Sequence, residues 1–139
     1  MRAKDYLMRI EEIDTAVRIK NDELLRYQEK ASGIGNYPEG ERVLSSRIVP
    51  DRMAEVIAEY AEIKDELIKQ TLELAKERQG IIDTISRLQP IDYEILYSKY
   101  AKGESFYVIG ANMGKSYRWV VGKHGTALIH LQKLLDQEQ

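Results

Sequence analysis

The chain has 139 residues, 43% of them hydrophobic and 32% charged, and its net charge is −2 at pH 7. These values predict a folded chain of one or two small domains. The sequence has no cysteine, which excludes disulfide frameworks, thiolate metal sites and cysteine nucleophiles. Its longest uninterrupted apolar run is Phe106–Ile109, too short for a membrane-spanning helix or a signal-peptide core.

Two long helices are predicted in the first part of the chain. The first covers Ala3–Ala31, and Ser32-Gly33 would end it because glycine accepts the left-handed conformation that often follows a helix. The glycines and prolines of Gly33–Pro50 predict a loop. The second helix is predicted from about Pro50 to Pro90, whose ring disfavours helical geometry in the preceding residue.

Apolar side chains recur along both long helices at three- and four-residue steps. The first series is Ala3, Leu7, Ile10, Val17 and Leu24, and the second is Met53, Ile57, Tyr60, Leu67, Leu74, Ile81, Ile85 and Leu88. This pattern predicts a helical hairpin over residues 1–89 for dimerisation or partner binding. The same seams could instead join two copies into a four-helix homodimer, and both arrangements stay open. The last apolar residues of the second helix must pack on the C-terminal part or on another chain.

Three shorter helices are predicted over residues 90–139, at 91–100, at 106–113 and from Ser116 towards Leu135. Gly103 and Gly114 would end the first two, while Ser105 and Ser116 would cap the second and the third. The third helix has an inner face at helical spacing, formed by Val120, His124, Ala127, Leu128, Leu131 and Leu134. The sequence therefore predicts an all-α protein.

The stretch VIGANMGKSYRWV, residues 108–120, has two competing interpretations. A phosphate-binding loop needs four residues between its first glycine and Gly-Lys-Ser, whereas Gly110 leaves three, and no parallel sheet is predicted around it. A helix-turn-helix needs a small residue in its first helix and a glycine at the turn, which Gly110 and Gly114 supply. It also needs apolar anchors, here Ile109, Met113 and Val120. The helix-turn-helix fits better, although Lys123 stands where an apolar residue is usual.

Charge is distributed unevenly along the chain. From Pro90 onward there are six basic and five acidic residues, whereas the part before it has 15 basic and 18 acidic ones. No acid occurs between Ser105 and Leu135, a stretch of 31 residues with four lysines and arginines. Such a local excess of positive charge favours an anionic partner. With the helix-turn-helix, it predicts that residues 90–139 form a domain that binds double-stranded DNA.

The segment EILYSKYAKGESFYVIGANMGKSYRWVVGKHGTALIHL resembles the promoter-reading domain of bacterial sigma factors (region four) and the output domains of response regulators. The shared positions are Tyr100, Gly103, Ser105, Gly114, Ser116 and Ala127-Leu128. The whole chain is similar to the ArpU- and RinA-like late transcription regulators of phages from Gram-positive hosts, most closely in YRWVVGKHGTAL. This resemblance implies a regulator, most simply an activator, of phage or prophage genes in the cytoplasm of a bacterial host cell. RNA polymerase is a further candidate partner.

In a helix-turn-helix, the start of the second helix enters the major groove. The predicted DNA-binding residues are Lys115, Ser116, Tyr117, Arg118, Val121, Gly122, Lys123 and Gly125. Arg118 is expected to read bases, because a guanidinium can pair bidentately with guanine, and the lysines are expected to contact phosphates. Gly122 and Gly125, both costly inside a helix, indicate either close approach to DNA or a kink or early end of the helix.

No catalytic residue, cofactor or metal site is predicted, and we expect the protein not to be an enzyme. His124 and His130 are six positions apart, so they lie on different faces, and no third metal ligand is evident. Two other functions stay open. One is a phage DNA-packaging recognition subunit of the small-terminase kind, which would assemble as a large ring. The other is an interaction protein that binds polymerase or a sigma factor without reading DNA.

Overall fold

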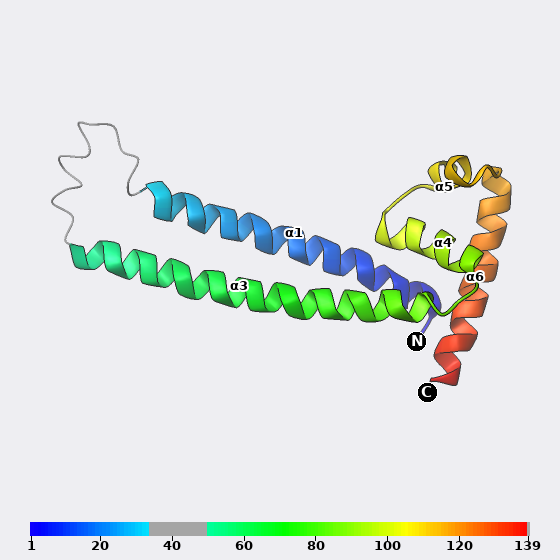
Figure 1. Cartoon of the computed structure of the whole chain (residues 1–139), viewed down its shortest axis with the longest axis horizontal. Coiled ribbons are helices and arrows are strands. Elements are labelled where there is room, and N and C mark those ends of the chain that lie inside the picture. Colours follow the sequence, from blue (N-terminus) through cyan, green and yellow to red (C-terminus); the bar gives the residue numbers. More distant parts are fainter. Residues whose placement is uncertain (34–49, 139) are drawn as a thin grey trace. The chain divides into compact units, whose positions relative to one another are not determined.

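The computed structural model of the chain describes residues 1–33 and 50–138, and the protein is all-α, as predicted. The elements, in chain order, are α1 (Ala3–Gly33), α3 (Pro50–Ile85), α4 (Pro90–Leu96), the π-helical turn η1 (Tyr97–Ala101), α5 (Phe106–Met113) and α6 (Tyr117–Gln137) (Figure 1). The loop predicted between the two long helices falls, apart from its ends, outside the described residues.

Internal contacts divide the chain into two units. Unit 1 comprises Met1–Thr15 and Ala75–Gln139, and unit 2 comprises Ala16–Leu74. Both long helices therefore contribute a segment to each unit. The boundary predicted between residues 89 and 90 lies inside unit 1. The packing does not follow that boundary, and a functional division there stays a prediction.

Unit 1 contains most of the apolar core. Its buried apolar side chains are Ala3, Leu7, Ile10, Ile13, Ile81, Ile82, Ile85, Ile95, Leu96, Tyr100, Ile109, Val120, Ala127 and Leu131. The isoleucines at the end of α3 were expected to need cover beyond the first helix, and they are buried within this unit of a single chain. Polar contacts also tie its segments together, since the Ala3 backbone N–H donates to Gln132 Oε1 at 2.7 Å.

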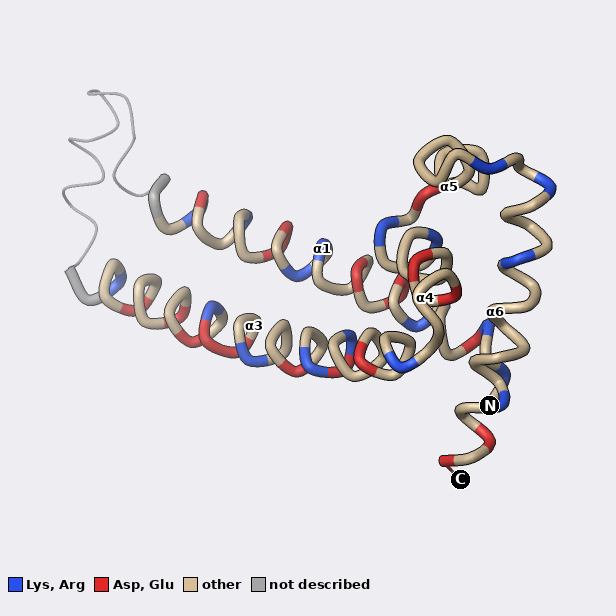
Figure 2. Tube along the Cα trace, turned by 45° about the vertical axis from the view of Figure 1, so that its right-hand side comes forward, with Lys and Arg blue, Asp and Glu red and all other residues tan. Residues whose placement is uncertain are grey.

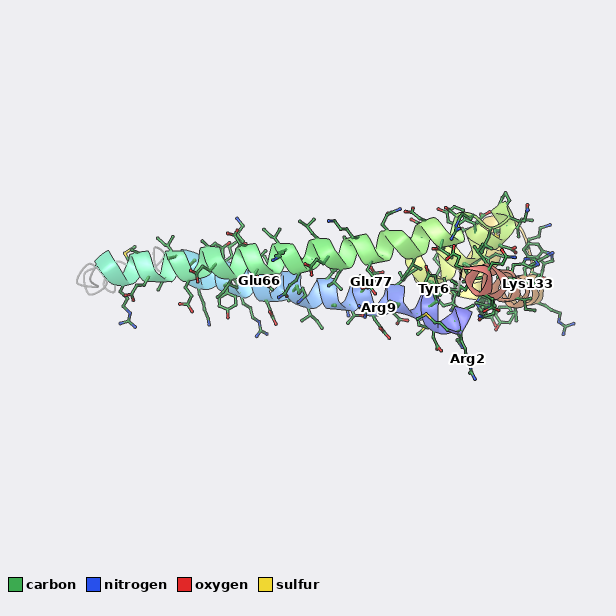
Figure 3. All side chains as sticks on the ribbon, turned by 90° about the horizontal axis from the view of Figure 1, so that it is seen from below. Arg2, Tyr6, Arg9, Glu66, Glu77 and Lys133 are labelled. Atoms are coloured by element: carbon green, nitrogen blue, oxygen red, sulfur yellow. The ribbon has the colours of Figure 1, made fainter. Side chains whose placement is uncertain are left out.

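Ion pairs and hydrogen bonds join α1 to α3 inside unit 1. Arg9 donates to both carboxylate oxygens of Glu77, at 2.7 and 2.9 Å, and the two residues face each other in Figure 3. The Tyr6 hydroxyl donates to Thr84 at 2.9 Å. The hydrogen bond from Arg9 lowers the pKa of the Glu77 carboxyl. Tyr6 of α1 contacts Thr84, and Arg9, further along α1, contacts Glu77, which comes earlier in α3, so the two helix segments are antiparallel within this unit. Because the side chains of Arg9 and Glu77 are exposed, their ion pair contributes little to stability.

Unit 2 has very little core of its own. Among its described residues, Leu67 is the one buried apolar side chain, and the Lys20 ammonium donates to Gln70 Oε1 at 2.6 Å. Met53 and Ile57 were predicted to lie in the seam, but they are 39% and 57% exposed. For Ile57 the prediction is wrong because, at about 100° per residue, its side chain lies about 80° around the axis of α3 from Leu67. Met53 lies about 40° from Leu67, and the helical phase does not explain its exposure.

Two helix boundaries differ from the predictions. α3 ends at Ile85, whereas it was expected to reach Pro90. Gln89 is extended, with ψ of 150°, and Pro90 stands in the first turn of α4, where its fixed φ is favourable. The predicted helix at 91–100 is α-helical to Leu96 and π-helical beyond it. Gly103 then ends it with a φ of 70°, as expected.

Candidate nucleic-acid interface

α5 and α6 are joined by a tight turn whose residues match their predicted roles. Ser105 caps α5 by accepting the Val108 N–H at 3.3 Å, and Ser116 caps α6 by accepting the Trp119 N–H at 3.1 Å. Between them, Gly114 is left-handed with a φ of 68°. The two caps and the glycine thus set where α5 ends and where α6 begins.

Gly110 allows α5 to approach this turn closely. A Cβ at this position would lie 2.7 Å from the Lys115 carbonyl oxygen and 3.4 Å from Val120 Cγ2. The first distance is shorter than real Cβ contacts allow, and the neighbour is backbone, which cannot swing away. Position 110 therefore has no room for a Cβ, and the small residue expected there is required by the packing of α5 on the turn.

A small apolar cluster holds the two helices on α4. Ile95, Ile109 and Val120 are each at most 1% exposed, and Phe106, Met113 and Trp119 pack around them. The three predicted anchors of the motif belong to this cluster. The inner face of α6 continues with buried Ala127 and Leu131, while His124, Leu128 and Leu134 are half-buried. The cluster fixes which side of α6 faces outward.

The outward side of α6 carries most of the predicted DNA-binding residues. Those that are exposed are Lys115, Ser116, Tyr117, Arg118, Val121, Gly122 and Gly125. At about 100° per residue, the residues at 117, 118, 121, 122 and 125 share one face of the helix. Arg118 makes no hydrogen bond or ion pair with the residues that the structure describes. Its guanidinium is therefore available to a partner.

α6 runs without interruption through Gly122 and Gly125, so the expected alternative of an early helix end is wrong. A Cβ at either position would meet nothing within 4 Å. The protein's own packing therefore requires neither glycine, in contrast to Gly110. What the two glycines do provide is a stretch of α6 whose backbone is uncovered on the outer face.

Lys123 is the one predicted DNA-binding residue that is half-buried. Its ammonium lies 5.7 Å from the centre of the Trp119 ring, and that of Lys115 lies 5.2 Å from the same centre. Such cation–π contacts explain how a lysine can occupy a position where an apolar residue is usual. They also gather two positive charges around one half-buried indole at the start of α6.

The predicted DNA-binding residues include Tyr117 but omit Tyr107, which stacks on it in the structure. Tyr107 of α5 is 71% exposed and Tyr117 of α6 is 45% exposed, and their ring centres are 4.3 Å apart in a stacked arrangement. The signal in the sequence was the apolar run Phe106–Ile109. One short amphipathic helix cannot bury four consecutive side chains, so some of them had to face outward.

The two histidines of α6 serve the packing of unit 1. His124 Nε2 and the Tyr100 hydroxyl are joined by a hydrogen bond of 2.9 Å, and the Phe106 ring centre is 4.9 Å from the imidazole. Burial, with smaller contributions from the charges of Lys99 and Lys4, lowers the pKa of His124. His130 Nδ1 lies 2.6 Å from a carboxylate oxygen of the buried Asp92, which ties α6 to α4.

The charged residues at the α5–α6 turn and along most of α6 are basic. In Figure 2, Lys and Arg positions mark the α5–α6 connection and the length of α6, and acidic positions return at its C-terminal end. The N-terminus of a helix also carries a partial positive charge and free N–H groups. The start of α6 therefore combines three sources of attraction for an anion: its side chains, its dipole and its backbone.

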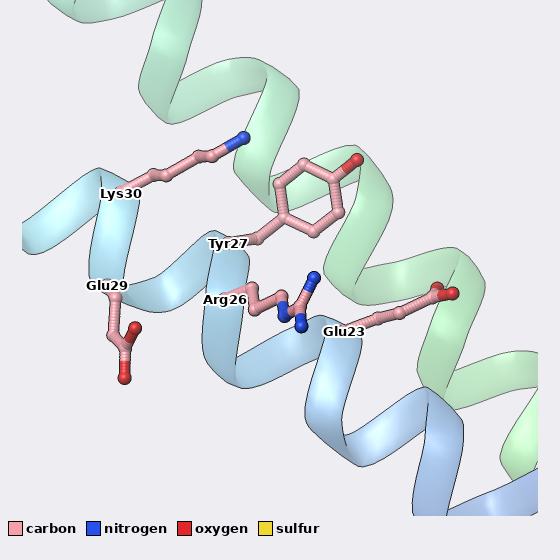
Figure 4. Close-up of a pocket in the computed structure, with 5 residues that line it drawn as sticks. All are labelled: Glu23, Arg26, Tyr27, Glu29 and Lys30. Atoms are coloured by element: carbon pink, nitrogen blue, oxygen red, sulfur yellow. The ribbon is translucent and has the colours of Figure 1, made fainter.

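No other described part of the molecule forms a comparable site. One opening, of about 600 Å³, is lined by Glu23, Arg26, Tyr27, Glu29 and Lys30 of α1, where neither charge predominates (Figure 4). Nowhere in residues 1–33 and 50–138 do three His, Cys, Asp or Glu side chains gather as a metal site would need. No helix in those ranges combines the length and apolar character that crossing a membrane requires.

The turn between α5 and α6 and the outer face of α6 thus make up the candidate interface. Its interpretation rests on its own residues. Comparisons of the chain with protein-family models, with curated proteins and with solved structures found no match.

Proposed function

We propose that the protein binds double-stranded DNA sequence-specifically through the outer face of α6 and regulates transcription of phage or prophage genes. The observation that carries this proposal is that Arg118, which has no hydrogen-bond or ion-pair partner among the described residues, shares the outer face of α6 with Gly122 and Gly125, two glycines that the fold itself does not need. All three lie in a 31-residue stretch without an acidic residue. A duplex in which guanine edges and phosphates lie side by side fits this combination.

The role of each residue in binding bases or phosphates follows from the chemistry of its side chain. Arg118 reads guanine through two parallel hydrogen bonds, and Val121, which is 39% exposed, supplies an apolar contact of the kind that recognises a thymine methyl. The glycines let the helix backbone approach the base edges. Lys115, Ser116 and Tyr117 sit at the helix start, where contacts to phosphate fix the register.

The regulatory role rests on the resemblance to sigma region four and to the phage late regulators, whose motif positions include Gly114 and Ser116. In this chain those positions form the turn and the cap of α6. A reading helix positioned in this way suits recruitment to a promoter, and activation is the outcome we propose. Contact with RNA polymerase belongs to the same proposal.

The experiment is selection of bound duplexes from a random-sequence pool by the full-length protein, followed by affinity measurements over a salt series. We expect one enriched motif. Arg118→Ala should reduce the preference for that motif by about 1–3 kcal/mol, the value of a bidentate base contact. Arg52→Ala, which removes an exposed arginine from α3 instead, is the matched control and should leave the preference unchanged.

A second measurement separates base reading from phosphate binding. Lys115→Ala should weaken binding to all duplexes alike and should lower the slope of log affinity against log salt by about one. If the pool shows no enrichment and binding is absent or equally weak for all duplexes at low salt, α6 does not read DNA. The protein would then act through protein partners.

A further inference from the structure

Unit 2 carries a second apolar face on α3, separate from the one that contacts α1. Ile57, Ile68 and Leu72 are 57%, 42% and 58% exposed, and Ala61 is exposed between them. At about 100° per residue, these four positions fall within about 60° of one another around the helix. We call residues 57, 61, 68 and 72 the stripe. Its centre lies about 110° around the helix axis from Leu67, the buried residue of the seam.

The stripe lies on unit 2, which has the smaller apolar core of the two units. Leu67 is its one buried apolar side chain among the described residues. A helix pair in water gains most of its stability from packing an apolar face, and two helices with one buried residue gain little. Soluble proteins seldom leave large aliphatic side chains in a row on the surface unless a partner covers them.

We propose that this stripe is the interface of a homodimer, in which α3 pairs with α3 of a second copy in parallel orientation. A two-fold axis along the helices sets each stripe residue against its own copy, as in a self-complementary interface. The proposal does not depend on DNA binding, and it assigns the predicted dimerisation to one helix face rather than to both long helices.

Charge beside the stripe selects the parallel orientation. Lys64 lies about 50° to one side of the stripe and Asp65 about 50° to the other. Neither makes a hydrogen bond or ion pair with the described part of the chain. In a parallel pair, the Lys64 side of the stripe in one copy meets the Asp65 side of the stripe in the other, so Lys64 of each copy faces Asp65 of its partner. In an antiparallel pair, the same side of the stripe in each copy would meet, and this would set lysine against lysine and aspartate against aspartate.

A groove beside the stripe gives the partner's side chains room to enter. It has a volume of about 120 Å³ and lies next to Ile68 and Leu72. Its other lining residues are Lys20, Asn21, Leu24, Leu67 and Thr71. Filling it with aliphatic side chains of a second copy would bury Leu24 and Leu67 more completely, and would add the core that unit 2 lacks.

The first test is the oligomeric state of the full-length protein by sedimentation velocity over a concentration series. We expect a dimer, and we expect Ile57→Glu and Leu72→Glu to raise its dissociation constant at least about tenfold, because each would bury a charge. Ile19→Glu is the matched control, since Ile19 is 52% exposed on α1 and lies off the stripe. Circular dichroism checks that all variants keep their helix content.

The second test uses the absence of cysteine, which lets a single introduced cysteine report the orientation. Leu72→Cys should form a disulfide-linked dimer on mild oxidation, because a parallel pair sets residue 72 against itself. An antiparallel pair centred on the stripe would place the two copies of residue 72 about 22 Å apart, beyond the reach of a disulfide. In that arrangement Lys64→Cys would cross-link instead.

Four results would overturn the proposal. A wild-type protein that stays monomeric at high micromolar concentration has no such interface. A dimer that the two glutamate variants leave intact uses another surface, and a ring of many subunits points to the packaging-subunit interpretation. A dimer that cross-links through residue 64 and not through residue 72 is antiparallel. None of these results bears on whether α6 reads DNA.

Discussion

The two sides of α6 differ in what the fold demands of them. On the inner side Val120, Ala127 and Leu131 are completely buried, and each contributes to the core of unit 1. On the outer side Arg118 has no partner among the described residues, and Gly122 has open space where a side chain would be. The inner residues are explained by packing alone, whereas the outer ones are not, so their explanation has to come from a partner.

The inner residues of α6 stabilise the fold, whereas the outer residues are available to a binding partner. Burial predicts where a substitution will cost free energy of unfolding, and exposure without a partner indicates where it will not. If the outer side serves a partner, its variants should lose binding while keeping or gaining stability. Inner and outer variants that lost stability and binding to the same extent would show that the two sides of α6 do not have different roles.

The largest expected effect comes from two aliphatic residues of α6 that lie two positions apart. Leu131→Ala should lower the free energy of unfolding by about 2–5 kcal/mol, because it leaves a cavity in a tightly packed core. Ile129 is 58% exposed, and Ile129→Ala should change that free energy by less than about 0.5 kcal/mol. Denaturant unfolding of both variants checks the difference. Equal losses would mean that the two sides of α6 are not distinguished by packing.

A smaller effect is expected from His124, at the margin between the two sides. Burial lowers its pKa in the folded protein from the ordinary value of 6.5, so the folded state disfavours the charged imidazole. The unfolded chain therefore takes up the proton first as the pH falls below that value. The contribution of His124 to stability is complete above about pH 6.5 and declines below it, by at most about 1.4 kcal/mol per pH unit for one proton.

Variants of the two histidines separate this effect from the titration of other groups. His124→Gln should flatten the fall in unfolding free energy between pH 6.5 and 5, measured by denaturant titration at each pH. His130→Gln changes the other histidine of the same helix and should leave the part due to His124 in place. An unchanged pH profile in His124→Gln would show that the imidazole is not held neutral by burial.

Much of this architecture could be predicted because it depends on residues that are close together in the sequence. The caps at Ser105 and Ser116 and the left-handed glycines at 103 and 114 depend on a few neighbouring residues. The anchors Ile109, Met113 and Val120 follow from helical spacing around one turn, and so does the requirement for glycine at position 110. Such features need no knowledge of distant parts of the chain.

The rest depends on tertiary packing and could not be predicted from neighbouring residues in the sequence. Pro90 was taken as the end of one helix although it begins the next, because both uses of proline look alike in a sequence. Ile57 fits a heptad pattern, but at about 100° per residue it lies about 80° around the helix axis from Leu67, and it is exposed. The stacked pair of Tyr107 and Tyr117 requires knowing how α5 and α6 cross. The same holds for the clustering of Lys115 and Lys123 at Trp119.

The smallest expected effect is also the most discriminating, because its two readouts should move in opposite directions. Gly122→Ala should raise the free energy of unfolding by about 1 kcal/mol, since alanine favours a helix over glycine and its Cβ meets nothing within 4 Å. If the uncovered backbone is there to approach DNA, the same methyl group should weaken binding to the selected duplex. Gly110→Ala is the control on the inner side, where the Cβ would collide with the Lys115 carbonyl and should lower stability instead. A stabilised Gly122→Ala variant with undiminished DNA binding would leave the glycine unexplained and would remove the close-approach argument from the proposal.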